Sequence, residues 1–127
     1  MNKPKEIVWV DAVTKDAKHT ATFYEKVLGL KADQVDEGDD RYSYSMQAGD
    51  KDVLGICTAD KFKRWVTGWV LYFTVEDYDL SIAEIACNGG EIFHEFEPAK
   101  PGGSRSCLLK DPSGNSIMIT ESTNPKA

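Results

Sequence analysis

Few side chains in this 127-residue chain have the type and spacing that metal or nucleophilic chemistry needs. The only two histidines are His19, in a predicted helix where a solvated position is the simpler interpretation, and His94, in a predicted strand. A site built on several histidines is therefore not indicated. The three cysteines are widely spaced and form no CxxC pair, which indicates reduced thiols rather than a disulfide framework or a structural zinc site.

The loop before the last predicted hairpin holds a second candidate. Arg105 follows the pair Gly102-Gly103, so it could clamp a carboxylate or phosphate through two hydrogen bonds, or pair with a neighbouring acid at the surface. The loop lacks the Lys-Ser/Thr ending of a phosphate-binding loop and precedes a strand rather than a helix. No pair of groups is spaced as a general acid and base.

The elements that position these residues follow a repeated order. Ala17, Ala21, Tyr24 and Leu28 form one stripe of a predicted helix that ends at Gly29. The first half predicts a strand, this helix and three strands, at residues 7–13, 16–28, 31–35, 42–47 and 52–58. The second half repeats this order after about 60 residues, at 69–75, 77–87, 91–96, 106–109 and 116–119.

The last two predicted strands form a hairpin around Asp111-Pro-Ser-Gly-Asn115, because Pro and Gly favour this turn. The sequence thus predicts an α+β fold of two βαβββ modules that form a curved, half-open mixed sheet around a cleft. We expect one domain over residues 1–127, with module one at about 6–58 and module two at about 68–122.

Four segments in this order resemble the vicinal oxygen chelate superfamily, which includes glyoxalase I, bleomycin-resistance and fosfomycin-resistance proteins and extradiol dioxygenases. They are Phe23-Tyr-Glu-Lys-Val-Leu-Gly-Leu30, Val75-Glu-Asp77, Asn88-Gly-Gly-Glu-Ile92 and Lys110-Asp-Pro-Ser-Gly-Asn-Ser-Ile-Met118. The stretch Gly68-Trp-Val-Leu-Tyr72 is similar to a glyoxalase-like subgroup. The resemblance covers residues 7–121 and is strong for the fold but weak for the activity.

Metal-dependent members of that superfamily place one ligand on each of four strands. The resemblance puts these positions at Trp9, at Gly55 or Ile56, at Val70 and at Met118. None of these side chains offers the imidazole, carboxylate or thiolate that a divalent ion needs. A shift of two residues would offer Asp11 and Cys57, but the expectation is no metal and no cofactor.

The resemblance instead implies an apolar pocket with a few polar groups. By strand alternation Trp9 shares a face with Asp11, and Val70 with Tyr72, while either Tyr42 and Tyr44 or Ser43 and Ser45 face in from the third strand. For several of these residues core packing, or a solvated strand end for Asp11, is the competing interpretation. The expected ligand-binding residues are Trp9, Asp11, Tyr44, Trp65, Tyr72, Arg105 and Met118.

These features favour a metal-free protein that binds a small organic ligand. The alternative is a glyoxalase-like lyase, isomerase or dioxygenase, with non-standard metal ligands or with acid–base catalysis by Asp11, His94 or Glu121. A metabolite-sensing module is a third interpretation.

Bulk properties set further expectations. The net charge of −6 argues against a nucleic-acid partner, and no apolar run is long enough for a membrane span. The first five residues lack the apolar stretch of a signal peptide. We expect a cytoplasmic protein, and the resemblance implies a homodimer.

Overall fold

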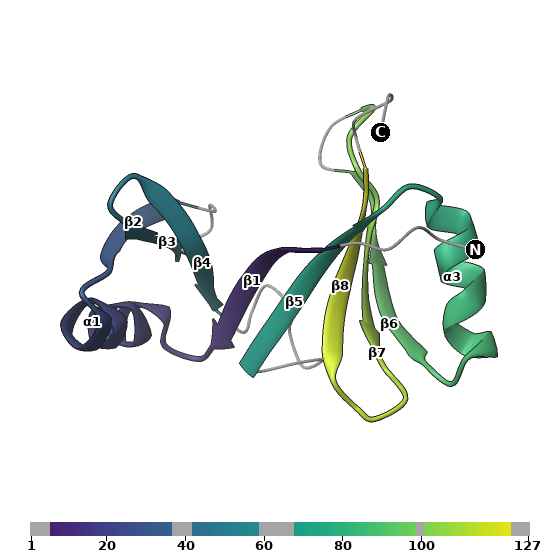
Figure 1. Ribbon diagram of the computed structural model, residues 1–127, viewed down its shortest axis with the longest axis horizontal. Coiled ribbons are helices and arrows are strands. Elements are labelled where there is room, and N and C mark those ends of the chain that lie inside the picture. The colour runs from purple at the N-terminus through teal and green to yellow at the C-terminus, as the bar shows by residue number, and fades with distance from the viewer. Residues whose placement is uncertain (1–5, 37–41, 59–67, 99–100, 123–127) are drawn as a thin grey trace. The chain divides into compact units, whose positions relative to one another are not determined.

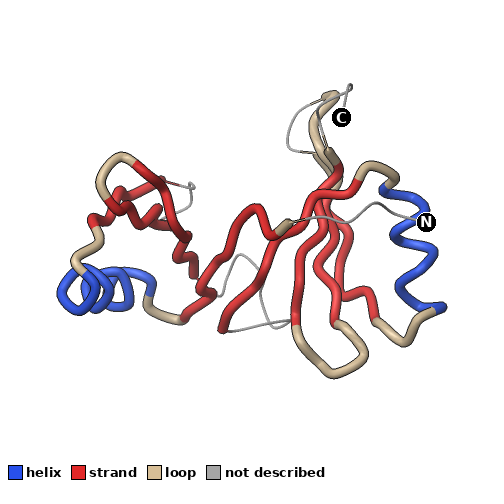
Figure 2. The backbone as a smooth tube through the Cα atoms, viewed as in Figure 1, coloured by secondary structure: helices blue, strands red, loops and turns tan. Residues whose placement is uncertain are grey.

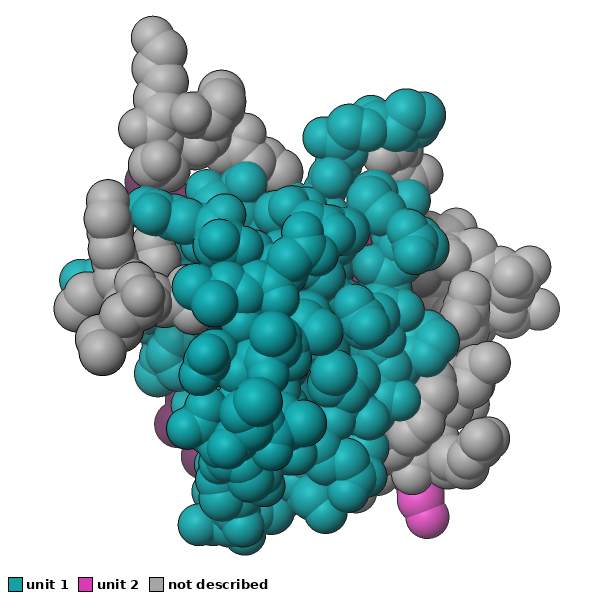
Figure 3. Space-filling model, turned by 90° about the vertical axis from the view of Figure 1, so that its right-hand side faces the viewer, with its two compact units in different colours: residues 1–8, 71–127 teal, residues 9–70 magenta. Residues whose placement is uncertain are grey.

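The computed structural model describes residues 6–36, 42–58, 68–98 and 101–122. The chain divides into two compact units, Trp9–Val70 and Met1–Val8 with Leu71–Ala127, coloured magenta and teal in Figure 3. Each unit has a hydrophobic core of its own. No helix among the described residues is long and apolar enough to cross a membrane.

Module one has the predicted order of strand, helix and three strands (Figure 1). Its sheet has the strand order β2-β3-β4-β1, with β1 parallel to β4 and the other pairs antiparallel. The elements are β1 (Ile7–Thr14), α1 (Ala17–Leu28), β2 (Lys31–Asp36), β3 (Tyr42–Ala48) and β4 (Lys51–Thr58).

Helix α1 packs its small residues against this sheet. The Asp16 side chain accepts a hydrogen bond from the His19 amide at 2.9 Å and caps the first turn, and Gly29 ends the helix at φ 71°. Ala17 and Ala21 pack against Met46 and other residues of the core. The predicted stripe fails at Leu28, which is 58% exposed, because the chain turns at Gly29 and places Leu30 against the core instead.

Module two repeats the same order (Figure 2). Its strand order is β5-β8-β7-β6, with β5 parallel to β8 and the other pairs antiparallel. The elements are β5 (Gly68–Val75), α3 (Tyr78–Cys87), β6 (Glu91–Phe96), β7 (Ser106–Lys110) and β8 (Ser116–Glu121). The predicted α+β class and the two βαβββ modules are thus confirmed, while a single domain stays a prediction.

The core of module two lies between α3 and its sheet. Tyr78, Ile82 and Ile85 of α3 pack toward Cys107 and Ile119, together with other residues of β5, β7 and β8. The small residues Ala83 and Ala86 of the same helix are exposed. The helix thus turns its larger apolar side chains inward.

The β7–β8 turn has the predicted chemistry. Asp111 Oδ1 accepts hydrogen bonds from the amides of Ser113 and Asn115, both at 2.9 Å, and Oδ2 accepts one from Asn115 Nδ2 at 3.0 Å. These bonds, the Asn115 side chain first, lower the pKa of Asp111. Gly114 adopts φ 94°, which the turn requires.

Candidate ligand site

The sheet of module one has one face covered by α1 and one opposite face, which we call the helix-free face. Ala12, Met46 and Ile56 belong to the core beneath α1. Their neighbours along each strand therefore point the other way. The strand register places Asp11 beside Gly55 and Gly55 beside Ser45, so these three residues form a row across β1, β4 and β3.

Asp11 and Trp9 form a hydrogen-bonded pair on the helix-free face. The Trp9 Nε1–H group donates to Asp11 Oδ1 at 2.8 Å. Asp11 is only 5% exposed, so its carboxylate is the one acidic group that the described part of the chain buries. A buried carboxylate needs hydrogen-bond partners, and the indole of Trp9 supplies one. The prediction that these two side chains share a face is confirmed.

Gly55 provides the space that this pair occupies. A Cβ atom on Gly55 would overlap Asp11 Oδ1 and would lie 3.0 Å from Trp9 Nε1. Gly55 does not have a positive φ, so space rather than backbone conformation requires glycine here. The glycine thus holds the carboxylate and the indole close against the strand. Sequence reasoning treated Gly55 only as a failed metal position, although glycine inside a strand signals close approach.

A second acidic residue reaches the same face through a β-bulge. The register shifts between Met46 and Gln47, so that Gln47 pairs with Asp52 and Val53 is the extra residue of β4. Asp52 Oδ1 accepts hydrogen bonds from Ser45 Oγ at 2.8 Å and from Gln47 Nε2 at 3.1 Å. These bonds, the one from Gln47 first, lower the pKa of Asp52. The helix-free face therefore presents polar acceptors and small residues beside one aromatic ring.

The other residues predicted to bind the ligand lie elsewhere or outside the described residues. Tyr44 packs against the core beneath α1. Of the two pairs predicted to face in from the third strand, Ser43 and Ser45 are therefore the ones on the same face of the sheet as Asp11. Trp65 is outside the described residues. Trp69 is 50% exposed, and its ring centroid lies 6.1 Å from that of Tyr24.

Tyr72 and Met118 lie side by side on module two. They are register partners on β5 and β8, and Met118 is also paired with Leu108 of β7. Because side chains alternate along a strand, Tyr72 and Met118 point to the opposite face of the sheet from Ile119 and Cys107, which pack beneath α3. Tyr72 and Met118 therefore belong to the face of module two away from its helix, as expected.

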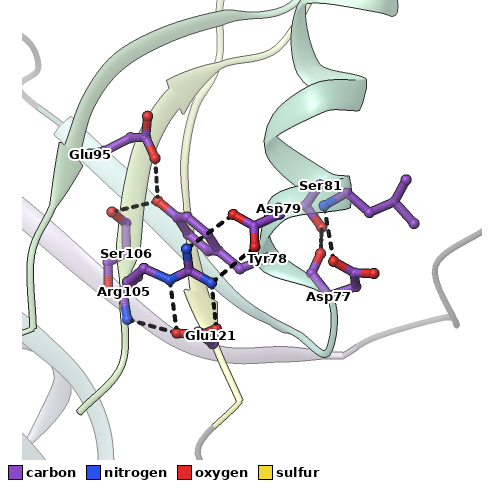
Figure 4. Close-up of polar contacts among 9 residues, drawn as sticks. Asp77, Tyr78, Asp79, Ser81, Glu95, Arg105, Ser106 and Glu121 are labelled. Carbon is purple, nitrogen blue, oxygen red and sulfur yellow. Dashed lines mark hydrogen bonds and ion pairs between the residues drawn. The ribbon is translucent and has the colours of Figure 1, made fainter. Parts of the chain in front are cut away.

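Arg105 pairs with neighbouring acidic side chains, which was the alternative to a ligand clamp (Figure 4). Its guanidinium lies 2.8 Å from Glu121 Oε2 and 3.0 Å from Asp79 Oδ1, and its centre lies 4.5 Å from the centroid of the Tyr78 ring. The Tyr78 hydroxyl donates to Glu95 at 3.0 Å and lies 3.2 Å from the Ser106 carbonyl oxygen. These contacts tie the start of α3 to the sheet of module two.

Two residues considered for acid–base catalysis also lie on module two. Glu121 is held by Arg105, and its pKa is lowered chiefly by the hydrogen bonds from the Arg105 side chain. His94 is exposed on β6, which lies at the edge of the sheet. The His94 ring lies edge-on to that of Phe96, with the ring centroids 4.6 Å apart.

The Arg105–Glu121 pair predicts a specific pH dependence of stability. Because the folded state lowers the pKa of Glu121, this pair stabilises the protein above the ordinary carboxyl pKa of about 4.3 and loses its effect as the pH falls further. We expect the unfolding midpoint of Glu121→Gln to fall less steeply below about pH 4.5 than that of the unchanged protein. Thermal unfolding of both proteins between about pH 3 and pH 7 measures how their midpoints depend on pH.

The control for this experiment is Glu97→Gln, because Glu97 is exposed and forms no ion pair with the described residues. This variant should follow the unchanged protein at every pH. Equal pH profiles for Glu121→Gln and Glu97→Gln would contradict a role for the Arg105 pair.

The residues at the inherited ligand positions do not fit a divalent ion. These side chains, Trp9, Gly55 or Ile56, Val70 and Met118, offer no carboxylate, imidazole or thiolate. Within the described ranges no three His, Cys, Asp or Glu residues are grouped so that they could hold a metal. The alternative pair Asp11 and Cys57 supplies two groups, one fewer than a protein metal site usually needs.

The sequence matches the model of a known protein family. Residues 6–119 match the model of the Glyoxalase/Bleomycin resistance protein/Dioxygenase superfamily. The chain belongs to this superfamily. The protein named "Putative glyoxylase CFP32" of Mycobacterium tuberculosis is 30% identical over 115 residues, which are 90% of this chain and 43% of the relative. This chain therefore spans less than half of the curated relatives that it matches.

Several solved structures share this fold at low sequence identity. The hypothetical protein BH1468 from Bacillus halodurans has a TM-score of 0.62 and 16% identity, with 94% of this chain and 96% of that chain covered. The Mn(II)-bound glyoxalase from Novosphingobium aromaticivorans has a TM-score of 0.61 and 19% identity, over 95% and 40%. A variant methylmalonyl-CoA epimerase of Streptomyces coelicolor has a TM-score of 0.57 and 17% identity, over 96% and 97%.

Proposed function

We propose that this glyoxalase-superfamily protein binds a small organic molecule without a metal, and that the ligand contacts the helix-free face of module one. The observation that carries this proposal is the Trp9–Asp11 pair held against Gly55. An aromatic side chain beside a fixed carboxylate supplies apolar area and orientation together, as small-molecule sites require.

The residues of this face favour a planar ligand that donates hydrogen bonds. The indole of Trp9 offers a flat apolar surface, while Asp11 and Asp52 offer only acceptor oxygens when ionised. Gly55 lets the carboxylate and the indole lie close to the strand, and Ser45 next to it in the register has a small side chain. Tyr72 and Met118 remain candidates for ligand contacts on module two.

The absence of metal is tested by elemental analysis of the protein purified without chelator. Because the inherited positions lack donor atoms, we expect less than about one tenth of an equivalent of manganese, nickel, zinc or iron. The control is the same preparation after dialysis against Mn²⁺ and then metal-free buffer. An equivalent that stays bound through this dialysis would overturn the metal-free proposal and favour the lyase, isomerase or dioxygenase alternative.

Ligand binding is tested by a tryptophan-fluorescence screen of planar organic amines and phenols. A ligand that stacks on Trp9 should change its emission, and Trp9→Phe should abolish that change because it removes the reporter and the hydrogen bond to Asp11. The matched control is Trp69→Phe, since Trp69 lies on β5 and is 50% exposed. Signals that survive Trp9→Phe but vanish in Trp69→Phe would place the ligand elsewhere.

Homodimer formation and cytoplasmic location remain expectations beside this proposal. Sedimentation velocity at several protein concentrations tests the first, and fractionation of the producing cells tests the second.

A further inference from the structure

A cavity of about 290 Å³ lies between α3 and the sheet of module two. Val75 and Ile119 line it and are each only 7% exposed, so the cavity reaches into the core of this module. The candidate ligand site lies on module one, so either site can fail without the other. Most of the residues that line the cavity are aliphatic, namely Val75, Ile85, Leu109, Ile117 and Ile119.

The cavity forms where α3 turns a small residue toward the sheet. Ser81, Glu84, Ile85 and Asn88 line it at spacings of three or four residues, so they form one stripe of the helix. Ser81 is 7% exposed and lies about one turn after the larger Tyr78, which packs in the same core. Because serine is much smaller than Tyr78 and Ile85, it leaves space between the helix and the sheet.

Both ends of α3 are fixed to the sheet, which holds the helix at this distance. At the start of the helix, the Tyr78 hydroxyl donates to Glu95 of β6 at 3.0 Å. At its end, the chain is in close contact with β7, because a Cβ atom on Gly90 would lie 2.9 Å from Ile85 Cγ2 and 3.0 Å from the Lys110 carbonyl oxygen. The cavity between these two anchors is therefore preformed, as in most small-molecule sites.

The polar side chains beside the cavity already form hydrogen bonds within α3 and its cap. Ser81 Oγ donates to the Asp77 carbonyl oxygen at 3.0 Å. Asn88 Nδ2 donates to the Glu84 carbonyl oxygen at 2.8 Å and to Glu84 Oε2 at 2.9 Å. Glu84 is the one charged residue among the described residues that line the cavity. The walls thus offer apolar surface, and their charge disfavours an anion.

We infer that this cavity binds a small uncharged apolar molecule, such as a single aromatic ring with a short alkyl group. Protein cores are close-packed, so a space of this size leaves its aliphatic walls without contacts that a ligand can supply. An aliphatic cavity of about 150 Å³ stays free of water and binds benzene. The larger cavity beneath α3 therefore has room for a substituted ring.

The inference is tested by isoleucine methyl chemical shifts of the full chain in titrations with toluene and, separately, with benzoate. Toluene donates no hydrogen bond, so it does not suit the helix-free face of module one. We expect the methyl signals of Ile85, Ile117 and Ile119 to shift to saturation with toluene, and benzoate to bind at least about tenfold more weakly. Shifts that rise linearly, or that are largest at Ile56 in the core of module one, would overturn the site. Equal affinities for the two probes would overturn an uncharged ligand.

Matched variants separate this cavity from other apolar surface. Ser81→Leu should weaken toluene binding about tenfold or more, because the longer side chain fills the space beneath α3. Ala83→Leu makes the same side chain at an exposed position of the same helix and should change the affinity by less than about twofold. Ile117→Phe fills the cavity from the sheet and replaces Ser81→Leu if that variant does not fold. Unchanged amide shifts in the β7–β8 turn confirm folding, and a folded filling variant that keeps its affinity for toluene would show that the site is wrong.

Discussion

Replacing Gly55 by alanine is expected to lower the free energy of unfolding by about 2 kcal/mol, although the change adds only one methyl group. The new Cβ atom would overlap Asp11 Oδ1 and crowd the Trp9 indole nitrogen, so the pair must separate or the strand must move. Urea unfolding measures the stability, and the Trp9 emission reports the change in its surroundings.

A double-mutant cycle shows whether the carboxylate causes this loss. In Asp11→Ala the oxygen that the methyl group would strike is gone, so adding Gly55→Ala should cost less than about half as much as it does in the unchanged protein. Equal costs in both backgrounds would mean that the strand backbone, not the carboxylate, rejects the side chain.

Truncation of a fully buried large side chain in either module should produce a large loss of stability. Met46 in module one and Leu108 in module two are both 0% exposed. We expect Met46→Ala and Leu108→Ala each to lower the free energy of unfolding by about 3 kcal/mol, since each loses transfer energy and leaves a cavity. Met46→Leu, which keeps the volume, should cost less than about 1.5 kcal/mol.

These variants also test whether the modules form one domain. Hydrogen exchange of slowly exchanging amides in β4 and β7 follows each module separately. If the chain is one cooperative domain, Met46→Ala should lower protection in both strands by the same free energy. Loss of protection in β4 alone would show that the two compact units unfold independently and would contradict the single-domain prediction.

The fold was predictable because its local signals agree with one another. Strand alternation placed Trp9 beside Asp11, and the turn residues from Asp111 to Asn115 marked the last hairpin before any contact was known. Leu28 was misplaced because helical spacing says nothing about where the underlying sheet ends or about the competing residue Leu30.

The candidate site was only partly predictable, because its decisive contacts are distant in sequence. The partners of Arg105 lie 16 and 26 residues away, so a pattern within the loop could not distinguish a ligand clamp from a structural ion pair. Tyr44 or Ser45 remained open until the strand register fixed which of them shares the side of Asp11. The role of Gly55 depends on β1, more than forty residues earlier in the chain.

The bulge in β4 has a consequence for how the β3–β4 hairpin keeps its alignment. Val53 and Leu54 are adjacent in sequence, yet both pack against the core of module one, which a regular strand would not allow. If β4 instead continued as a regular ladder past Leu54, Val53 would pair with Gln47, and Asp52 would turn to the opposite face. The hydrogen bond from Ser45 to Asp52 would be broken, and the Val53 side chain would take the place of the carboxylate. The extra residue therefore keeps a carboxylate on the helix-free face.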